Sequence, residues 1–246
     1  MIMNKLLVQI QISQYKRLPQ LQLCISSILK NCNPDIYRLY VIDDCPEDRE
    51  TKEWLKECSI TYPKIEYFFN EINLREQGTI NKGIDMAIRD EIPYVMTINN
   101  DVIVTVNDWL ESTLEPFEKI PDRGPYLPRV GMVVPDSAQL SVNKNRDYYE
   151  EIVNGFKLIE LGATWAACVK TELFKKIGNF NTEFFSVAID LDFCKRMKLY
   201  KWNIAIVEAK ILHDAHSQVD LIGKSAVDGY GKVDQKLMEY YWGRCW

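Results

Sequence analysis

Residues 92–106 read IPYVMTINNDVIVTV, and this stretch decides how the rest of the sequence is interpreted. An apolar run ends at Asn99, Asn100 and Asp101, and a second apolar run, Val102–Val104, follows directly. Short runs that are rich in β-branched residues are typical of buried strands. Burying two amides and a carboxylate at the end of a strand costs free energy unless these groups bind a partner. Because ligands of open α/β sheets lie beyond the carboxyl ends of the strands, we expect Asp101 to hold a divalent metal.

Strand-like and helix-like patterns alternate along the part of the chain that leads to this stretch. The expected strands are Leu6–Ile12, Tyr37–Ile42, Ile65–Phe69 and the quoted stretch as a fourth strand. The expected helices begin near Pro19, at Glu47 and at Thr79, and they end before Asn31, at Cys58 and at Arg89. This order predicts an α/β fold with a mostly parallel, Rossmann-like sheet flanked by helices. No GxGxxG follows the first strand, which argues against a dinucleotide-binding domain.

The second half of the sequence is less regular. The expected strands are Val130–Val134, Phe156–Leu161 with a continuation through 162–169, Asn203–Val207 and Lys210–Leu212. The expected helices are Trp109–Glu118, a helix that is capped by Thr171 and ends at Ile177, and a helix with Phe193, Met197 and Tyr200 on one face. A turn is expected at Arg123–Pro125 and a polar loop at 136–155. The tail, 217–246, is expected to be helical. Its aromatic end either folds over a site or forms a dimer contact, and the oligomeric state is left open.

Composition narrows the class of protein. The net charge of −5 and the pI of about 5.3 give no global basic field, so nucleic acid is not an expected partner. No apolar run approaches the ~20 residues of a membrane span, and polar residues interrupt the N-terminal apolar stretch, so we expect no transmembrane segment and no signal peptide. The 7 cysteines are scattered and form no CxxC, which favours reduced thiols in a cytoplasmic protein.

Polar residues flank the expected strands of the first half in a specific order. The stretches are Gln14–Arg17 (QYKR), Val41–Asp44 (VIDD), Asn73-Leu74 with Asn81–Ile84 and Ala87, and Ile98–Asp101 (INND). Together they resemble the inverting GT-A glycosyltransferases of family 2, whose motifs are Thr-Tyr-Asn-Arg, Val-Val-Asp-Asp, Asn-Leu…Asn-x-Gly-Ile…Ala and a DXD motif. The Leu-Asn-Asn-Asp form of that last motif is common among rhamnosyltransferase-like members.

Three later stretches extend the resemblance over roughly residues 5–216. Gly178–Phe185 is similar to the family's Gly-Gly-Phe-Asp-Glu-x-Phe-Phe, Asp190–Arg196 to its Glu-Asp-x-Asp-Leu-x-x-Arg, and Ile211–His213 to its later histidine segment. Each motif alone is weak, but their common order is specific. The resemblance implies a single GT-A-like domain, with a nucleotide-sugar-binding half at about 1–105, an acceptor and catalytic half at about 106–216, and the tail.

The resemblance also implies an activity and its chemistry. It implies a metal-dependent inverting glycosyltransferase of the hexosyltransferase type, which moves a sugar from a nucleotide-diphosphate donor to an acceptor hydroxyl. Negative charge develops on the leaving diphosphate, and Mn²⁺ or Mg²⁺ held by Asp101 and His213 would neutralise it. Inversion needs a base that takes the proton of the acceptor hydroxyl, and the resemblance assigns that role to Asp190.

Further residues are expected to contact the nucleotide sugar, a UDP- or dTDP-sugar, while the acceptor is expected to be a glycan or another hydroxyl-bearing molecule. These residues are Gln14, Tyr15, Arg17, Asp43, Asp44, Arg75, Asn81, Asn99, Asn100 and Trp165. One of the acids Asp43 and Asp44 would accept a hydrogen bond from the nucleobase. The alternative for these two acids is N-capping of the following helix. Trp165 either forms a wall of the acceptor site or is a core aromatic, and His213 and Arg75 equally fit structural or solvated positions.

Two departures from the family pattern motivate a second hypothesis. Ile189 stands where the family has a glutamate, and Asn99 replaces the leading acid of the DXD motif. The chain could therefore be a catalytically impaired nucleotide-binding or scaffolding module on the same fold. A nucleotidyltransferase is less favoured, because the loop after the first expected strand, QYKRLPQ, contains no glycine.

Overall fold

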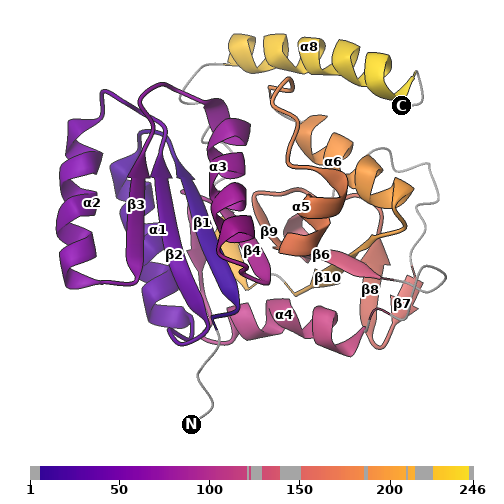
Figure 1. Ribbon diagram of the computed structural model, residues 1–246, viewed down its shortest axis with the longest axis horizontal. Coiled ribbons are helices and arrows are strands. Elements are labelled where there is room, and N and C mark those ends of the chain that lie inside the picture. The colour runs from indigo at the N-terminus through magenta and orange to yellow at the C-terminus, as the bar shows by residue number, and fades with distance from the viewer. Residues whose placement is uncertain are drawn as a thin grey trace.

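The computed structural model describes residues 6–120, 122, 129–138, 151–185, 188–208, 210–213 and 224–243. In its first half, strands and helices alternate as the sequence predicts (Figure 1). The elements are β1 (Val8–Gln14), α1 (Leu18–Asn31), β2 (Tyr37–Asp43), α2 (Arg49–Thr61), β3 (Ile65–Phe69), α3 (Arg75–Arg89) and β4 (Tyr94–Asn99). The strands lie parallel in the order β3-β2-β1-β4, which confirms the predicted Rossmann-like arrangement.

The quoted stretch forms two strands in two different sheets, so its prediction as one strand is wrong. The chain turns at Asn100 and Asp101 and then forms β5 (Val102–Val104). Strand β5 leaves the main sheet and pairs antiparallel with β11 (Ile211–His213). The three polar residues therefore mark the point where the chain leaves the main sheet.

The second half extends the main sheet with antiparallel and parallel strands. Its elements are α4 (Trp109–Lys119), β6 (Val130–Pro135), η1 (Asp136–Ala138), β7 (Glu151–Val153), β8 (Phe156–Ile159), β9 (Ala166–Lys170), α5 (Thr171–Ile177), α6 (Ala188–Leu199), β10 (Asn203–Val207) and α8 (Lys224–Trp242). Within the described ranges the sheet has nine strands in the order β3-β2-β1-β4-β9-β6-β10-β8-β7. The fold class is α/β, as predicted.

Several local predictions in this half are corrected. Strands β8 and β9 are separate, because β8 pairs with β10 whereas β9 lies between β4 and β6. Thr171 is the first residue of α5 and not its cap, and its hydroxyl has no hydrogen-bond partner among the described residues. Tyr200 follows α6 and is 51% exposed instead of facing the core. Strand β7 lies inside the predicted polar loop, whose residues 139–150, like the predicted turn at 123–125, lie outside the described residues.

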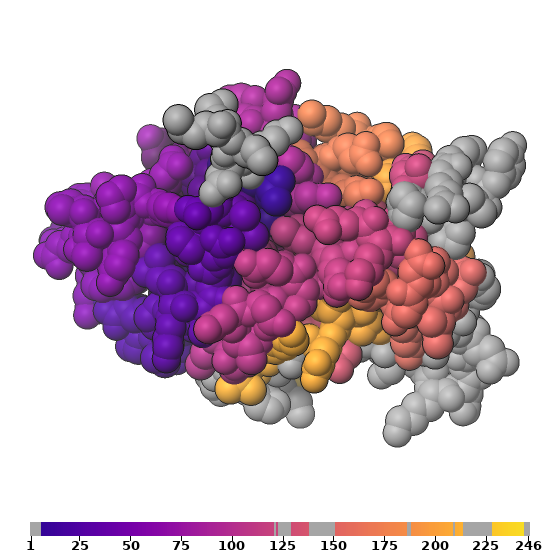
Figure 2. Space-filling model, turned by 90° about the horizontal axis from the view of Figure 1, so that it is seen from below, coloured from indigo at the N-terminus to yellow at the C-terminus, as the bar shows by residue number. Residues whose placement is uncertain are grey.

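Helices cover both faces of the sheet, which makes three layers. One apolar cluster joins the sheet to α1 and α4, and a second joins it to α3, α5, α6 and Met238 of α8. Figure 2, a view from below, shows α4 in the middle between the N-terminal elements and the β7–β8 hairpin. None of the helices in the described ranges combines the length and hydropathy that a membrane span needs.

Two glutamines in the centre of the sheet fix α3 on β1. Gln9 Nε2 donates to the carbonyl of Gly83 (2.7 Å), and Gln11 Nε2 donates to the carbonyl of Ile80 (3.1 Å). Gly83 must lack a side chain, because a Cβ there would lie 2.1 Å from Gln11 Oε1. Buried amides that find partners in this way specify one register between helix and strand.

Candidate functional site

Asp101 and His213, the two predicted metal ligands, lie together. His213 Nε2 is 3.4 Å from Asp101 Oδ1, and the Asp101 side chain is only 1% exposed. The small antiparallel sheet explains this proximity, because its register sets His213 opposite Val102, the residue after Asp101. The two residues that were expected to share a site are therefore neighbours in the fold, and their binding of a metal stays a prediction.

Trp165 orients the imidazole of His213. The two rings stack with centroids 4.1 Å apart and planes 11° from parallel. The carbonyl of Trp165 accepts a hydrogen bond from the backbone N–H of Asn99 (2.9 Å), which ties this residue to the end of β4. Trp165 also packs against both apolar clusters, so it is a core aromatic and a wall of the Asp101–His213 pair at once.

The pair fits a divalent cation by the chemistry of its donor atoms. A carboxylate oxygen and an imidazole nitrogen are ligands that Mn²⁺ accepts, and the carboxylate also suits Mg²⁺. Among the described residues no group of three or more His, Cys, Asp and Glu side chains could hold a metal. Two protein ligands alone leave most coordination positions for water and phosphate oxygens, which is the usual arrangement where a metal binds a nucleotide.

Asp190 lies in the first turn of α6 and is held by Thr164. Its Oδ1 accepts hydrogen bonds from the backbone N–H of Thr164 (3.0 Å) and from the Thr164 hydroxyl. Burial raises the pKa of Asp190 to about 6, and the bonds from Thr164 oppose that rise. Thr97 Oγ1 in turn donates to the carbonyl of Thr164 (2.6 Å). Residues 164 and 165 therefore join Asp190 to the Asp101–His213 pair.

Thr97 and Thr164 were not predicted from the sequence to belong to the site. Thr97 lies within an apolar strand, where a threonine is ordinary, and Thr164 lies in a stretch predicted to be strand. Only the pairing of β4 with β9 brings the two side by side. A polar residue inside an otherwise apolar strand was the one available clue.

The two acids at the end of β2 have different environments. Asp44 Oδ1 accepts hydrogen bonds from Asn70 Nδ2 (2.8 Å) and from the backbone N–H of Leu74 (2.7 Å), so Asp44 organises the loop before α3. Neither acid caps the following helix α2, because Asp48 does so by accepting from the N–H of Thr51 (3.0 Å). The capping alternative is therefore wrong for α2.

Asp43 differs from Asp44 in having one buried carboxylate oxygen without a hydrogen-bond partner among the described residues. Its Oδ1 accepts from the backbone N–H of Cys45 (3.2 Å), whereas its Oδ2 is buried with no hydrogen-bond partner among the described residues. Burial raises the pKa of Asp43 to about 6. A buried acceptor without a donor costs about 1–3 kcal/mol, so a ligand that donates to Oδ2 recovers this free energy.

Residues between β1 and α1 form the neighbouring edge of the site. Gln14 is buried and accepts a hydrogen bond from Asn100 Nδ2 (2.8 Å), so these two residues brace the turn before Asp101. Tyr15 is 37% exposed. Lys16 and Arg17 have φ angles of 57° and 60°, in the left-handed region, and Arg17 precedes α1 as its N-cap residue. A contact of Tyr15 or Arg17 with a sugar nucleotide stays a prediction.

Arg75 and Asn81 hold the segment that leads to α6. Arg75 Nη2 donates to the carbonyl of Thr182 (2.8 Å), and its guanidinium lies 4.5 Å from the ring centroid of Phe185. Asn81 Nδ2 donates to the carbonyl of Phe180 (2.8 Å), whose own N–H donates back to Asn81 Oδ1 (3.0 Å). This structural role was not expected from the sequence, and a contact of either side chain with a sugar nucleotide stays a prediction.

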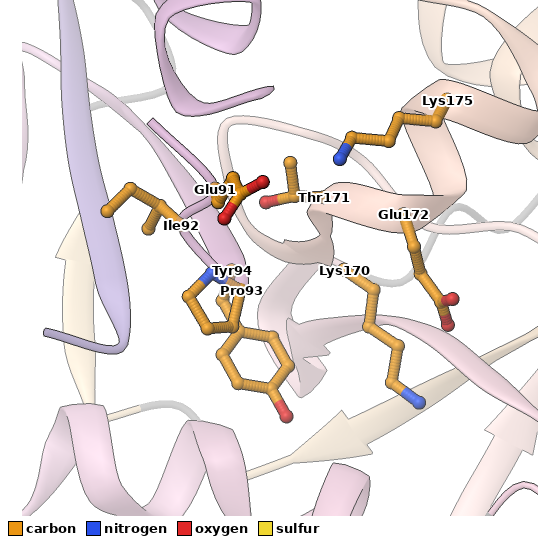
Figure 3. Close-up of a pocket in the computed structure, with 8 residues that line it drawn as sticks. All are labelled: Glu91, Ile92, Pro93, Tyr94, Lys170, Thr171, Glu172 and Lys175. Atoms are coloured by element: carbon orange, nitrogen blue, oxygen red, sulfur yellow. The ribbon is translucent and has the colours of Figure 1, made fainter. Parts of the chain in front are cut away.

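A cavity of about 410 Å³ lies at the other end of β4, away from these residues (Figure 3). Its lining is Glu91, Ile92, Pro93, Tyr94, Lys170, Thr171, Glu172 and Lys175. Figure 3 shows the Lys175 amine, the Glu91 carboxylate and the Thr171 hydroxyl turned toward one another. None of the predicted site residues lines this cavity, so it is separate from the site at Asp101.

The fold is that of the GT-A glycosyltransferases, as comparison with solved structures shows. Mannosyltransferase PcManGT from Pyrobaculum calidifontis, in complex with GDP-Man and Mn²⁺, is similar with a TM-score of 0.59 and 14% identity, over 82% of this chain and 55% of its own. GalNAc-T7 with UDP, GalNAc and Mn²⁺ is similar with a TM-score of 0.65 and 13% identity, over 85% and 44%. TarS 1–349 from S. aureus in complex with UDP-GlcNAc gives 0.58 and 14%, over 82% and 56%. The chain thus spans about half the length of these proteins.

The sequence places the chain in one family within that class. Residues 10–177 match the profile described as Glycosyl transferase family 2. This match covers more than half of the chain, and the protein belongs to glycosyl transferase family 2. A search of curated proteins found no significant match.

Proposed function

We propose that this protein is a metal-dependent inverting glycosyltransferase. It moves a sugar from a nucleoside diphosphate donor to the hydroxyl of a glycan or a similar acceptor. The observation that carries the proposal is the convergence of Asp101, His213 and Asp190 on residues 164 and 165. A candidate metal pair and a candidate base thus lie on two sides of one short segment, as a reaction between a diphosphate and a hydroxyl requires.

The donor would bind along the ends of β1, β2 and β4. Asp43 Oδ2 would accept a ring N–H of the nucleobase, a group that uracil, thymine and guanine carry and that cytosine and adenine lack. Tyr15 and Arg17 would contact the base or the diphosphate. When Mn²⁺ or Mg²⁺ is bound by Asp101 and His213, it supplies positive charge against the charge that develops on the departing diphosphate. The similar proteins that carry GDP-Man or UDP-GlcNAc support a nucleotide sugar as the donor class.

Asp190 would act as the general base. Thr164 occupies its Oδ1, so we assign the other carboxylate oxygen to the acceptor hydroxyl. The acceptor oxygen attacks the anomeric carbon, the bond from that carbon to the diphosphate oxygen breaks, and the hydroxyl proton moves to Asp190. A pKa of about 6 suits this task, because the group is ionised at neutral pH yet more basic than an ordinary aspartate.

The second candidate, a nucleotide-binding module without turnover, rests on Ile189 and Asn99. Ile189 is 7% exposed and belongs to the second apolar cluster, so the side chain that replaces the family's glutamate stabilises the core beside Asp190. An apolar residue at that position is therefore compatible with an active base at the next one. We retain the module as the outcome expected if nucleotides bind and no donor is consumed.

A two-stage experiment separates the candidates. Thermal shifts with UDP, dTDP and GDP, each with and without Mn²⁺, should give a Mn²⁺-dependent rise in Tm for one base class. Release of nucleoside diphosphate from UDP-glucose, UDP-GlcNAc, dTDP-rhamnose and GDP-mannose should then be measurable, with water as acceptor or with added glycans. Binding without any release supports the module, and neither binding nor release contradicts both candidates.

A further inference from the structure

Helix α8 lies against the end of α6 that carries Asp190 (Figure 1). It comes from the tail, far along the chain from the other residues of the site. Met238 of α8 is buried in the second apolar cluster, so the helix is docked on the domain by an apolar contact. Four residues of α8, Tyr230, Asp234, Tyr241 and Trp242, add polar or aromatic contacts to this packing, and each contact reaches a residue on one side of Asp190 or the other.

Asp234 of α8 binds the segment that precedes Asp190. Its side chain is buried, with the residue 2% exposed. Oδ1 accepts a hydrogen bond from the backbone N–H of Phe185 (2.7 Å), and Oδ2 accepts one from the backbone N–H of Ala188 (3.4 Å). Ala188 is the first residue of α6, and the first N–H groups of a helix have no partner within it. An acid from another helix therefore caps the helix that presents Asp190.

Trp242 of α8 binds the residue on the other side of Asp190. Its Nε1 donates to Asp192 Oδ1 (3.0 Å), while Asp192 Oδ2 forms an ion pair with Arg196 Nη2 (2.8 Å). Positions two apart on a helix point to different faces. Accordingly Asp192 faces α8 while Asp190 faces Thr164. The contact from α8 thus reaches α6 without touching the carboxylate of Asp190.

Two tyrosines of α8, Tyr230 in its first half and Tyr241 next to Trp242, hold residues before Asp190. Tyr230 stacks on Phe185 with centroids 5.2 Å apart and planes 9° from parallel, and Arg75 lies over the Phe185 ring. The Tyr241 hydroxyl donates to the carboxylate of Glu183. Contacts with α8 therefore hold residues on both sides of Asp190, namely Glu183, Phe185 and Ala188 before it and Asp192 after it.

We propose that Asp234, together with Trp242, is a positioning residue for the transfer reaction and sets the place of Asp190 relative to the acceptor. This inference rests on the proposed role of Asp190 as the base. Asp234 acts through the backbone N–H groups of Phe185 and Ala188, and it touches no reacting group. A displacement of about 1 Å at a catalytic group can lower a rate by about 100-fold, so a cap at the start of α6 controls turnover.

The test compares Asp234→Asn with Asp228→Asn in the full chain. The amide presents N–H groups where one carboxylate oxygen accepted, so either Phe185 or Ala188 loses its acceptor, whereas Asp228 is exposed on the same helix. We expect Asp234→Asn to lower kcat for diphosphate release from the nucleotide sugar of the panel that turns over fastest, by about 10- to 100-fold. KM for that nucleotide sugar and the Mn²⁺-dependent thermal shift with the matching nucleoside diphosphate should stay at wild-type values. Asp228→Asn should match the wild type throughout.

Trp242→Phe keeps an aromatic side chain but removes the pyrrole ring with the N–H that binds Asp192, so we expect a smaller, several-fold loss of kcat with KM unchanged. Tyr240→Phe, at an exposed position, is its control. An unchanged kcat in Asp234→Asn overturns the inference. So does a loss of kcat that is accompanied by an equal loss of nucleotide binding, because that pattern means general unfolding. A wild-type protein without turnover overturns the proposed function itself, and that result is distinct from an active wild type with an equally active Asp234→Asn.

Discussion

The donor side and the acceptor side of the site are held in different ways. On the donor side, Gln14, Asp43 and Asn99 are the last residues of the parallel strands β1, β2 and β4, and β1 pairs with both of the others. On the acceptor side, Asp190 depends on Thr164 and, through the backbone of α6, on Asp234 in α8. The first arrangement follows from the sheet alone, whereas the second requires three distant segments to pack correctly. The acceptor side is therefore the part of the site that depends most on tertiary contacts.

The largest expected effect is that of Asp190→Asn, which tests whether the acceptor side carries the chemistry. We expect diphosphate release to fall by about 100- to 10,000-fold, because the amide cannot take the acceptor proton. Mn²⁺-dependent binding of the nucleoside diphosphate should persist, since it belongs to the donor side. Steady-state kinetics and thermal shifts measure the two sides separately. Asp35→Asn, at an exposed position, is the control. Wild-type turnover in Asp190→Asn would exclude Asp190 as the base.

Asp101→Asn should weaken the Mn²⁺-dependent binding of the nucleoside diphosphate, which Asp190→Asn should leave unchanged. Loss of the carboxylate beside His213 should weaken nucleoside diphosphate binding in Mn²⁺ by about 100-fold. At a ligand concentration of about 100 times the wild-type Kd, this lowers the stabilisation by the ligand from about 2.7 to about 0.4 kcal/mol. Thermal shift with and without Mn²⁺ is the measurement. The shift without Mn²⁺ should be the same in variant and wild type. If the Mn²⁺-dependent shift survives intact, the metal assignment is wrong.

The variants Asp43→Asn and Asp44→Asn test whether the two acids of the donor side have different roles. Asp43→Asn should weaken nucleotide binding by about 10-fold, because a hydrogen bond to a charged group contributes about 1.5–3 kcal/mol. Asp44→Asn should instead lower the free energy of unfolding by about 1–3 kcal/mol, because Asp44 joins Asn70 and Leu74. Calorimetric titration and chemical denaturation distinguish the two. Equal effects of both variants on binding and stability would contradict the distinction.

The smallest expected effect is a dependence of stability on pH. The pKa of Asp43 is about 6 in the folded protein against 3.8 ordinarily, so the folded state holds this proton more tightly than the unfolded chain does. The free energy of unfolding should therefore fall as the pH rises from about 4 to about 6, with Asp43 contributing on the order of 1 kcal/mol. Asp190 contributes in the same direction. Denaturation curves of Asp43→Asn should show a shallower fall than those of the wild type, and an equal slope would contradict the burial of this charge.

The same difference between the two sides explains what the sequence could predict. Alternating patterns located the strands, and acids at strand ends indicated Asp43, Asp44 and Asp101. These features depend on local periodicity and on where a strand ends. The expectation that His213 lies beside Asp101 came from the resemblance to family 2, since the position of His213 after a short strand left its role open.

The remaining features depend on contacts that no local pattern encodes. Asp234 reads as an ordinary helical acid, and nothing in its neighbourhood indicates that it accepts from Phe185 and Ala188. The separation of β4 from β5 depends on the pairing of β5 with β11. Thr171 looked like a cap, but the backbone of Lys170 already occupies that position. In each case a distant partner, or the backbone itself, overrides the local preference.

The glutamine contacts inside the sheet also bear on how far the donor side can change. Gln9 and Gln11 bind the carbonyls of Gly83 and Ile80, so a shift of α3 along β1 would leave buried amides without partners. These hydrogen bonds fix the position of α3 and of the loop before it, where the backbone N–H of Leu74 donates to Asp44. The spacing between β1 and α3 is therefore set by buried hydrogen bonds, and the loop that contacts Asp44 depends on them.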